Sequence, residues 1–182
     1  KGSLAYQPGD ALAVWHRNPK WLVQRVCSHF TQLSPQAIAL LRDQYELTRL
    51  NQLFLQAVWQ ALEENTELKN ILAQPMDSAV RHAYFQQRTV TDVLMQLPSS
   101  LSEQQLFAIL QPLQPRLYSI SCSQDLFPTE VHIAISPFTY QAFDGTQQNG
   151  AASYFLTEEL QAGDVLTIEV RPNEKFRLPE HV

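Results

Sequence analysis

The feature that most constrains the fold of this chain is a double change in the spacing of its apolar residues. Residues 11–15 form a short, mostly apolar run that is typical of a strand. From about residue 18 to residue 110 the apolar side chains recur at the 3/4 spacing of amphipathic helices. Pro112 and Pro115 end this region, and an alternating pattern follows. The sequence therefore predicts an α+β protein in which helices over residues 17–111 interrupt a set of strands.

Capping signals indicate where several of the helices begin. Ser34 followed by Pro35 predicts an N-cap and a proline at the first helical position. Ser102 with Gln105 is typical of a capping box. We expect Thr48 to cap the helix that follows it.

The helical region carries no cluster of His, Cys or carboxylate residues at the spacing of a metal site. We also expect Asp77 to cap a helix, and we interpret Phe54 and Trp59 as core residues. His16, at the end of the first strand, is expected to lie at the surface without a functional role. These helices are therefore predicted to serve mainly packing.

The remaining local structure is predicted from turn residues and alternation. Pro8-Gly9-Asp10 is typical of a turn before the first strand. The later elements are expected to be strands over 116–121, 131–135 and 165–170, a polar loop over 143–149, and a helix over 150–160.

Composition excludes several classes of protein. The net charge of −5 and the scattered arginines argue against nucleic-acid binding, which needs a basic surface. Cys27 and Cys122 are the only cysteines, and they have neither metal nor redox spacing, so a reducing cytoplasm is expected. The opening residues are not expected to form a signal peptide, and no apolar run in the sequence is long enough to cross a bilayer.

Two short stretches indicate a binding site. In an extended Arg116-Leu117-Tyr118-Ser119, the guanidinium and the phenol share one face, which suits a flat ligand that carries phosphate. Small residues over 150–153 open a helical pattern, where unpaired backbone amides favour an anion. An ordinary strand with unremarkable side chains is the alternative interpretation of the first stretch.

Taken together, the two stretches resemble the FAD-binding segment of the ferredoxin-NADP reductase superfamily, in its diflavin reductase branch. Residues 6–15, 130–133 and 173–179 are similar to the flavoprotein alpha subunit of NADPH-dependent sulfite reductase. The resemblance implies an antiparallel β-barrel FAD-binding domain formed by residues 1–16 and 112–182, incomplete at its N-terminus. Residues 17–111 would then be an inserted helical connecting sub-domain.

The same resemblance implies the chemistry and the partners. FAD would accept hydride from NADPH and pass electrons to FMN and then to the sulfite-reducing hemoprotein subunit. The FMN domain and the NADPH-binding domain would belong to the same polypeptide, outside this stretch, so the chain alone is expected not to turn over NADPH. Two alternatives stay open: the FAD domain of another diflavin reductase, such as a cytochrome P450 reductase relative, or a non-catalytic docking module.

The resemblance also implies roles for individual residues. Arg116 would pair with the diphosphate, Tyr118 would pack along the cofactor, and Ser119 would act near the flavin N5 as the catalytic residue. Thr48 would lie at the FAD site, which competes with its interpretation as a plain cap. Ala151 departs from the glycine that relatives often have. The implied FAD-contacting residues are Thr48, Arg116, Leu117, Tyr118, Ser119, Ala134, Ile135, Ser136, Tyr140, Gly150, Ala151, Ala152 and Ser153.

Overall fold

The computed structural model describes residues 4–30, 32–62, 66–86, 88–142 and 145–176. The start of the predicted polar loop, at residues 143 and 144, and the last residues of the 173–179 stretch lie outside these ranges.

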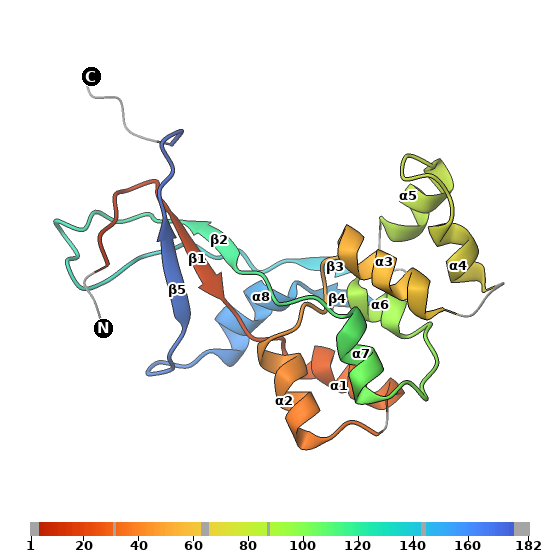
Figure 1. Cartoon of the computed structure of the whole chain (residues 1–182). Coiled ribbons are helices and arrows are strands. Elements are labelled where there is room, and N and C mark those ends of the chain that lie inside the picture. The colour runs from red at the N-terminus through yellow and green to blue at the C-terminus, as the bar shows by residue number, and fades with distance from the viewer. Residues whose placement is uncertain (1–3, 31, 63–65, 87, 143–144, 177–182) are drawn as a thin grey trace.

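Two antiparallel sheets and a group of helices make up the fold (Figure 1). In the larger sheet, β1 (Ala11–Trp15) is the central strand between β2 (Arg116–Ser119) and β5 (Thr167–Arg171). The smaller sheet is the hairpin of β3 (Thr139–Gln141) and β4 (Gln147–Asn149). These findings confirm the α+β class and the antiparallel pairing.

Helices α1 to α7 all follow β1 and precede β2, as the change in periodicity predicted. A short helix, α8, comes after the hairpin and continues into a π-helical turn, η1. The helices are α1 (Lys20–His29), α2 (Pro35–Asp43), α3 (Gln52–Ala61), α4 (Glu67–Leu72), α5 (Ala79–Phe85), α6 (Val90–Leu94), α7 (Glu103–Ile109), α8 (Ala151–Tyr154) and η1 (Phe155–Glu159).

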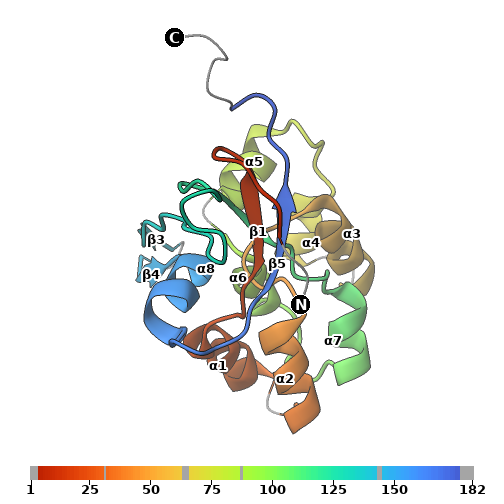
Figure 2. The same ribbon diagram turned by 90° about the vertical axis from the view of Figure 1, so that its left-hand side faces the viewer.

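The three-stranded sheet lies at one end of the molecule and helices α3 to α7 lie toward the other, with α8 and the β3–β4 hairpin between them (Figure 1). Turning the molecule shows the hairpin beside α8 on one flank, and α1 and α2 below the sheet (Figure 2). None of the helices in the described ranges has the length and apolar character needed to span a membrane.

Two of the predicted caps are confirmed and two are wrong. The Ser34 side chain accepts a hydrogen bond from the amide of Ala37, and Ser102 forms a capping box with Gln105. Asn51 caps α3 in place of Thr48, and Ser78 precedes α5 in place of Asp77. Each correct cap lies within three residues of the predicted one and is of an equally suitable type, so the sequence alone did not separate them.

The helical core has one clear correction. Phe54 is fully buried, as predicted, whereas the Trp59 side chain is 43% exposed. Both residues lie on α3, but Phe54 faces the helices packed against it and Trp59 faces outward. Amphipathic spacing predicted one apolar stripe, and the tryptophan lies outside the stripe that is buried.

Three other local expectations are corrected. Residues 131–135 form no strand, because only Ile133 bridges to Ile120. The later part of the predicted polar loop is strand β4, whose glutamines pair with β3. His16 is buried, with 2% of its surface exposed, and it lies near the charges of Arg116 and Glu46. Polar composition indicated a loop where β4 lies, but a short edge hairpin tolerates polar residues on both faces.

Two cores support the fold. The first joins the helices and extends to Ala151 in α8. The second lies on one face of the larger sheet, where Leu12 and Val14 of β1 pack with Ile120, and Leu156 of η1 contacts it. Because α8 and η1 contribute to both cores, this segment fixes the sheet relative to the helices.

The turn before β1 generates a prediction about stability. Gly9 has a φ of 90°, and a Cβ there would lie 2.1 Å from the backbone oxygen of Phe176. Gly163 has a similar φ of 96° with open space around it, so it is a matched control. We expect Gly163→Ala to lower the free energy of unfolding by about 1 kcal/mol, and Gly9→Ala by about 3 kcal/mol. Equal losses in urea unfolding would contradict the close packing of Phe176 on this turn.

Candidate functional site

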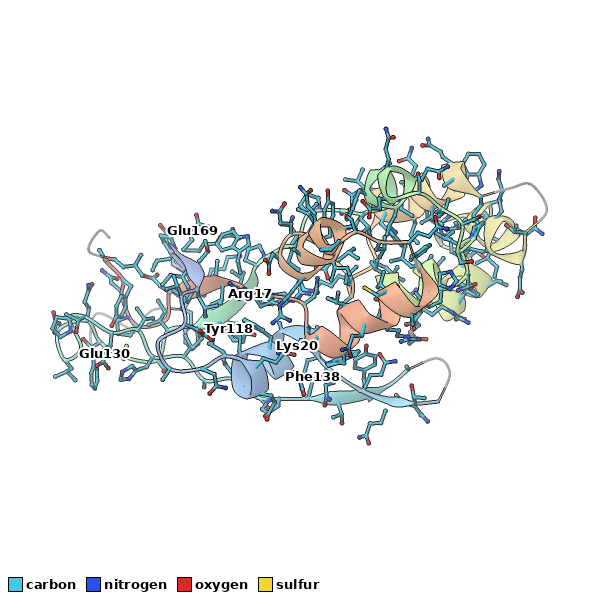
Figure 3. The ribbon with its side chains drawn as sticks, turned by 90° about the horizontal axis from the view of Figure 1, so that it is seen from below. Arg17, Lys20, Tyr118, Glu130, Phe138 and Glu169 are labelled. Carbon is cyan, nitrogen blue, oxygen red and sulfur yellow. The ribbon has the colours of Figure 1, made fainter. Side chains whose placement is uncertain are left out.

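A cavity of about 390 Å³ lies where β2, the start of α6, the hairpin and α8 meet. Its volume falls within the range of small-molecule sites in proteins. Tyr118 and Phe138, two aromatic residues of its wall, lie beside α8 (Figure 3). The lining residues are Thr48, Arg49, Thr89, Arg116, Leu117, Tyr118, Ser136, Phe138, Tyr140, Gly150, Ala151, Ala152 and Ser153.

The structure brings most of the predicted site residues together at this cavity. Ser119, Ala134 and Ile135 are the predicted residues that do not line it. Ser119 is exposed and lies on the face of β2 opposite Tyr118, in agreement with the predicted alternation along this strand. A role for Ser119 near the flavin stays a prediction.

Arg49, Thr89 and Phe138 also line the cavity, and sequence reasoning did not single them out. Arg49 directly follows the predicted site residue Thr48, so its place near the site was predictable from the sequence. Thr89 was detectable as a capping residue, because its side chain and that of Asp92 form a capping box at the start of α6. Phe138 had no signal, since an exposed aromatic in a loop has no pattern of its own.

Arg116 reaches the cavity from β2 and pairs with a buried carboxylate. Its Nη2 lies 3.3 Å from Oε2 of Glu46 and 3.1 Å from Oγ1 of Thr48. The two charged side chains are only 12% and 3% exposed. Among the described residues, the buried Nη1 of Arg116 has no hydrogen-bond partner. Arg116 therefore presents a fixed cation in the wall of the cavity.

Glu46 also organises the turn that follows it. Its Oε1 accepts hydrogen bonds from the Thr48 amide at 3.0 Å, the Thr48 hydroxyl at 2.6 Å and the Arg49 amide at 3.1 Å. Burial by itself would raise the pKa of Glu46, but the bonds from Thr48 and the charge of Arg116 outweigh burial and lower it. Glu46 is therefore ionised at neutral pH.

The other wall of the cavity is the start of α8. Gly150 precedes this helix, and Ala151, Ala152 and Ser153 are all buried. The first amides of a helix have no intrahelical acceptor, so they point their N–H groups toward its N-terminal end. The Ser153 hydroxyl donates to the Gly150 carbonyl at 3.0 Å. Ala151 is accommodated as the first helical residue, so its departure from glycine leaves the helix start intact.

Gly150 is needed for a steric reason. Its φ of −64° is open to any residue, but a Cβ there would lie 2.3 Å from the ring of Phe138. Phe138 therefore lies directly against the backbone at the start of α8. Its ring is 59% exposed and stands 6.3 Å from that of Tyr140, so aromatic surface remains available at the edge of the cavity.

His16 lies behind this cluster as a buried neutral base. Burial, followed by the charges of Arg116 and Arg49, lowers its pKa from 6.5 to about 4, although Glu46 opposes the shift. Neither ring nitrogen finds a hydrogen-bond partner in the part of the chain that the structure describes. Over the same ranges, no group of His, Cys, Asp and Glu is arranged to hold a metal ion.

The buried histidine generates a prediction about acid stability. Because the folded protein lowers the pKa of His16 from 6.5 to about 4, the unfolded chain takes up this proton at higher pH. The contribution of His16 to the free energy of unfolding is therefore fully present above pH 6.5. It falls by on the order of 3 kcal/mol as the pH falls toward 4. His16→Leu should remove that part of the pH dependence. Urea unfolding at both pH values measures it, and an unchanged acid dependence in the variant would refute the assignment.

Comparison with known proteins places the chain in a family. Residues 39–155 match the model of the FAD binding domain family, and this range contains every residue that lines the cavity. The chain is also similar to sulfite reductase [NADPH] flavoprotein alpha-components. It is 36% identical over 186 residues to that of Yersinia enterocolitica, 33% over 189 residues to that of Zymomonas mobilis, and 35% over 188 residues to that of Neisseria meningitidis serogroup A.

These alignments cover 97%, 98% and 97% of this chain and 30% of each relative, so the chain spans about a third of the length of the proteins it matches. The family model covers well over half of the chain. The chain belongs to the FAD-binding domain family.

Proposed function

We propose that this chain binds FAD in the cavity between β2 and α8. The observation that carries the proposal is the convergence of Arg116 with the small residues 150–153 on one cavity. The guanidinium of Arg116 in the cavity wall fits an anionic group, and so do the first amides of α8. A dinucleotide with a diphosphate supplies such a group.

Each wall of the cavity suits a different part of the cofactor. Arg116 and the amides at the start of α8 would hold the diphosphate. Tyr118 and the exposed ring of Phe138 offer flat surface to the aromatic parts of the ligand. Burial raises the pKa of Tyr118, so its phenol stays neutral and can donate a hydrogen bond to the ribose or phosphate.

FAD, when bound, supplies the acceptance of hydride and the release of electrons one at a time. This chain's own residues then bind the cofactor, orient it and shield it from water. Arg116 enters this role already placed by Glu46. Ser119, at the end of β2, is proposed to act toward the flavin ring, although its side chain lies outside the cavity.

We further propose that the chain is the FAD-binding fragment of a sulfite reductase flavoprotein. The similarity over nearly its whole length supports this assignment above that of another diflavin reductase. NADPH would reduce FAD, and electrons would leave through FMN to the sulfite-reducing hemoprotein, in the cytoplasm. The NADPH-binding and FMN domains would lie in the rest of the same polypeptide.

The domain plan is part of this proposal. Residues 1–16 and 112–182 would form the FAD-binding barrel, and residues 17–111 a helical connecting insertion. Support comes from the position of α1 to α7 between β1 and β2, and from the separate core that these helices form. Because Thr48, Arg49 and Thr89 line the cavity, the helical region also contributes to the cofactor site.

A docking role for the helices is the second candidate function, in addition to FAD binding. Helices α3 and α5 and the link between α4 and α5 expose large apolar side chains, which favours contact with another domain. The FMN domain is the proposed partner. The exposed side chains are Leu53, Trp59, Met76 and Val80.

The FAD proposal is tested by removing the cation. We expect Arg116→Ala to weaken FAD binding by about 1.5–3 kcal/mol, because a charge-assisted hydrogen bond to the diphosphate is lost. Arg171→Ala is the matched control, since Arg171 pairs with Glu169 on the exposed edge strand β5. Titration followed by the absorbance and fluorescence of FAD measures both. A wild-type protein that takes up no FAD, or equal affinities for wild type and Arg116→Ala, would overturn the assignment.

A further inference from the structure

We propose that Glu46 is the positioning residue of this site. Its single carboxylate holds Arg116, the Thr48 hydroxyl and the turn to Arg49 in the arrangement that receives a diphosphate. The inference rests on the proposed function and deepens it, because it assigns a role to a residue that does not line the cavity.

The two oxygens of the Glu46 carboxylate contact different partners. Oε2 faces Nη2 of Arg116 at 3.3 Å, whereas Oε1 accepts all three bonds from the turn. Because the side chain of Glu46 is 3% exposed, little water competes for either oxygen. One group therefore fixes a side chain from the sheet and a turn from the helical region at the same time.

The Thr48 hydroxyl has a defined direction. It donates its proton to Glu46 at 2.6 Å, which leaves its lone pairs to accept from Nη2 of Arg116 at 3.1 Å. Glu46 thus orients Arg116 both directly and through Thr48. With Nη2 held by these two acceptors, the guanidinium is fixed in the wall of the cavity.

The backbone that carries Glu46 is held in place by hydrogen bonds to two other segments. The Glu46 amide donates to the Gln111 carbonyl at 2.8 Å, and the Val90 and Thr91 amides donate to the carbonyls of Thr48 and Leu47. The segment is therefore held on one side by the approach to β2 and on the other by the start of α6. A carboxylate on such a support can define a geometry to within the tolerance that ligand binding needs.

A carboxylate beside Arg116 also has an unfavourable effect, because its negative charge repels an anionic ligand. Arg116 is 12% exposed, and without a counter-charge a guanidinium this deeply buried is strongly unfavourable. It would then turn toward solvent and leave the cavity wall. Because the side chain must stay in place to meet the ligand, positioning outweighs the loss of positive charge.

The test is Glu46→Gln, which keeps an oxygen for the turn and replaces the oxygen that faces Arg116 with an amide. We expect the Kd for FAD to rise about tenfold in this variant. In an Arg116→Ala background, the same change should alter the Kd less than about twofold, because the partner through which it acts is absent. Affinity for riboflavin, which has the ring system and no phosphate, should change less than about twofold in Glu46→Gln.

Glu169→Gln is the matched control, because it removes one carboxylate from an exposed pair with Arg171. Glu169 lies well apart from Phe138 (Figure 3), so FAD affinity should be unchanged. If Glu46→Gln does not fold, as judged by circular dichroism, Glu46→Asp takes its place. The shorter aspartate keeps the charge but moves the carboxylate away from Arg116. The same non-additivity with Arg116→Ala is expected.

The outcomes separate the two proposals. If wild type binds FAD and Arg116→Ala weakens binding, but Glu46→Gln binds like wild type, the positioning role is wrong and the FAD site stands. Equal losses in the wild-type and Arg116→Ala backgrounds, or an equal loss of riboflavin, would show that Glu46 serves only the fold. If wild type binds no FAD, the proposed function itself fails.

Discussion

The structure depends on a buried pairing between a carboxylate from the helical region and a guanidinium from the sheet. Glu46 and Arg116 come from segments far apart in the sequence, and both are almost fully withdrawn from water. A buried ion pair is expensive to form and is tolerated where the remaining lone pairs are satisfied. The turn at Thr48 satisfies them, so the pair can stay ionised inside the protein.

This pairing explains why the cavity lies where the helices meet the strands. Segment 44–48 runs beside residues 111–113, directly before β2, and backbone hydrogen bonds join the two. On the opposite wall, α8 and η1 reach both cores, through Ala151 and Leu156. The Glu159 carboxylate at the end of η1 pairs with Arg42 of α2 at 3.1 Å. Both walls of the cavity are therefore attached to helices and to sheet, which suits a site that must keep its shape.

Much of the fold and the site was predictable, because local patterns were strong where they mattered. The switch in periodicity placed α1 to α7 between β1 and β2, and alternation put Arg116 and Tyr118 on one face of β2. The errors occurred where neighbouring residues offered equal local signals. Thr48 and Asn51 are both good caps, and the choice between them was made by Glu46, which accepts the Thr48 hydroxyl proton and holds Thr48 outside the helix.

By itself, the sequence determined the class of the fold, the place of the helices between the first strand and β2, and the two stretches that meet at the cavity, because these follow from spacing and residue type. Only the tertiary structure decided that Glu46 faces Arg116, that His16 is buried behind them and that Phe138 covers Gly150. The physical reason is that burial and pairing depend on which distant segments pack together. No local sequence pattern identifies the partner of a buried charge, because the two side chains come into contact only when the chain folds.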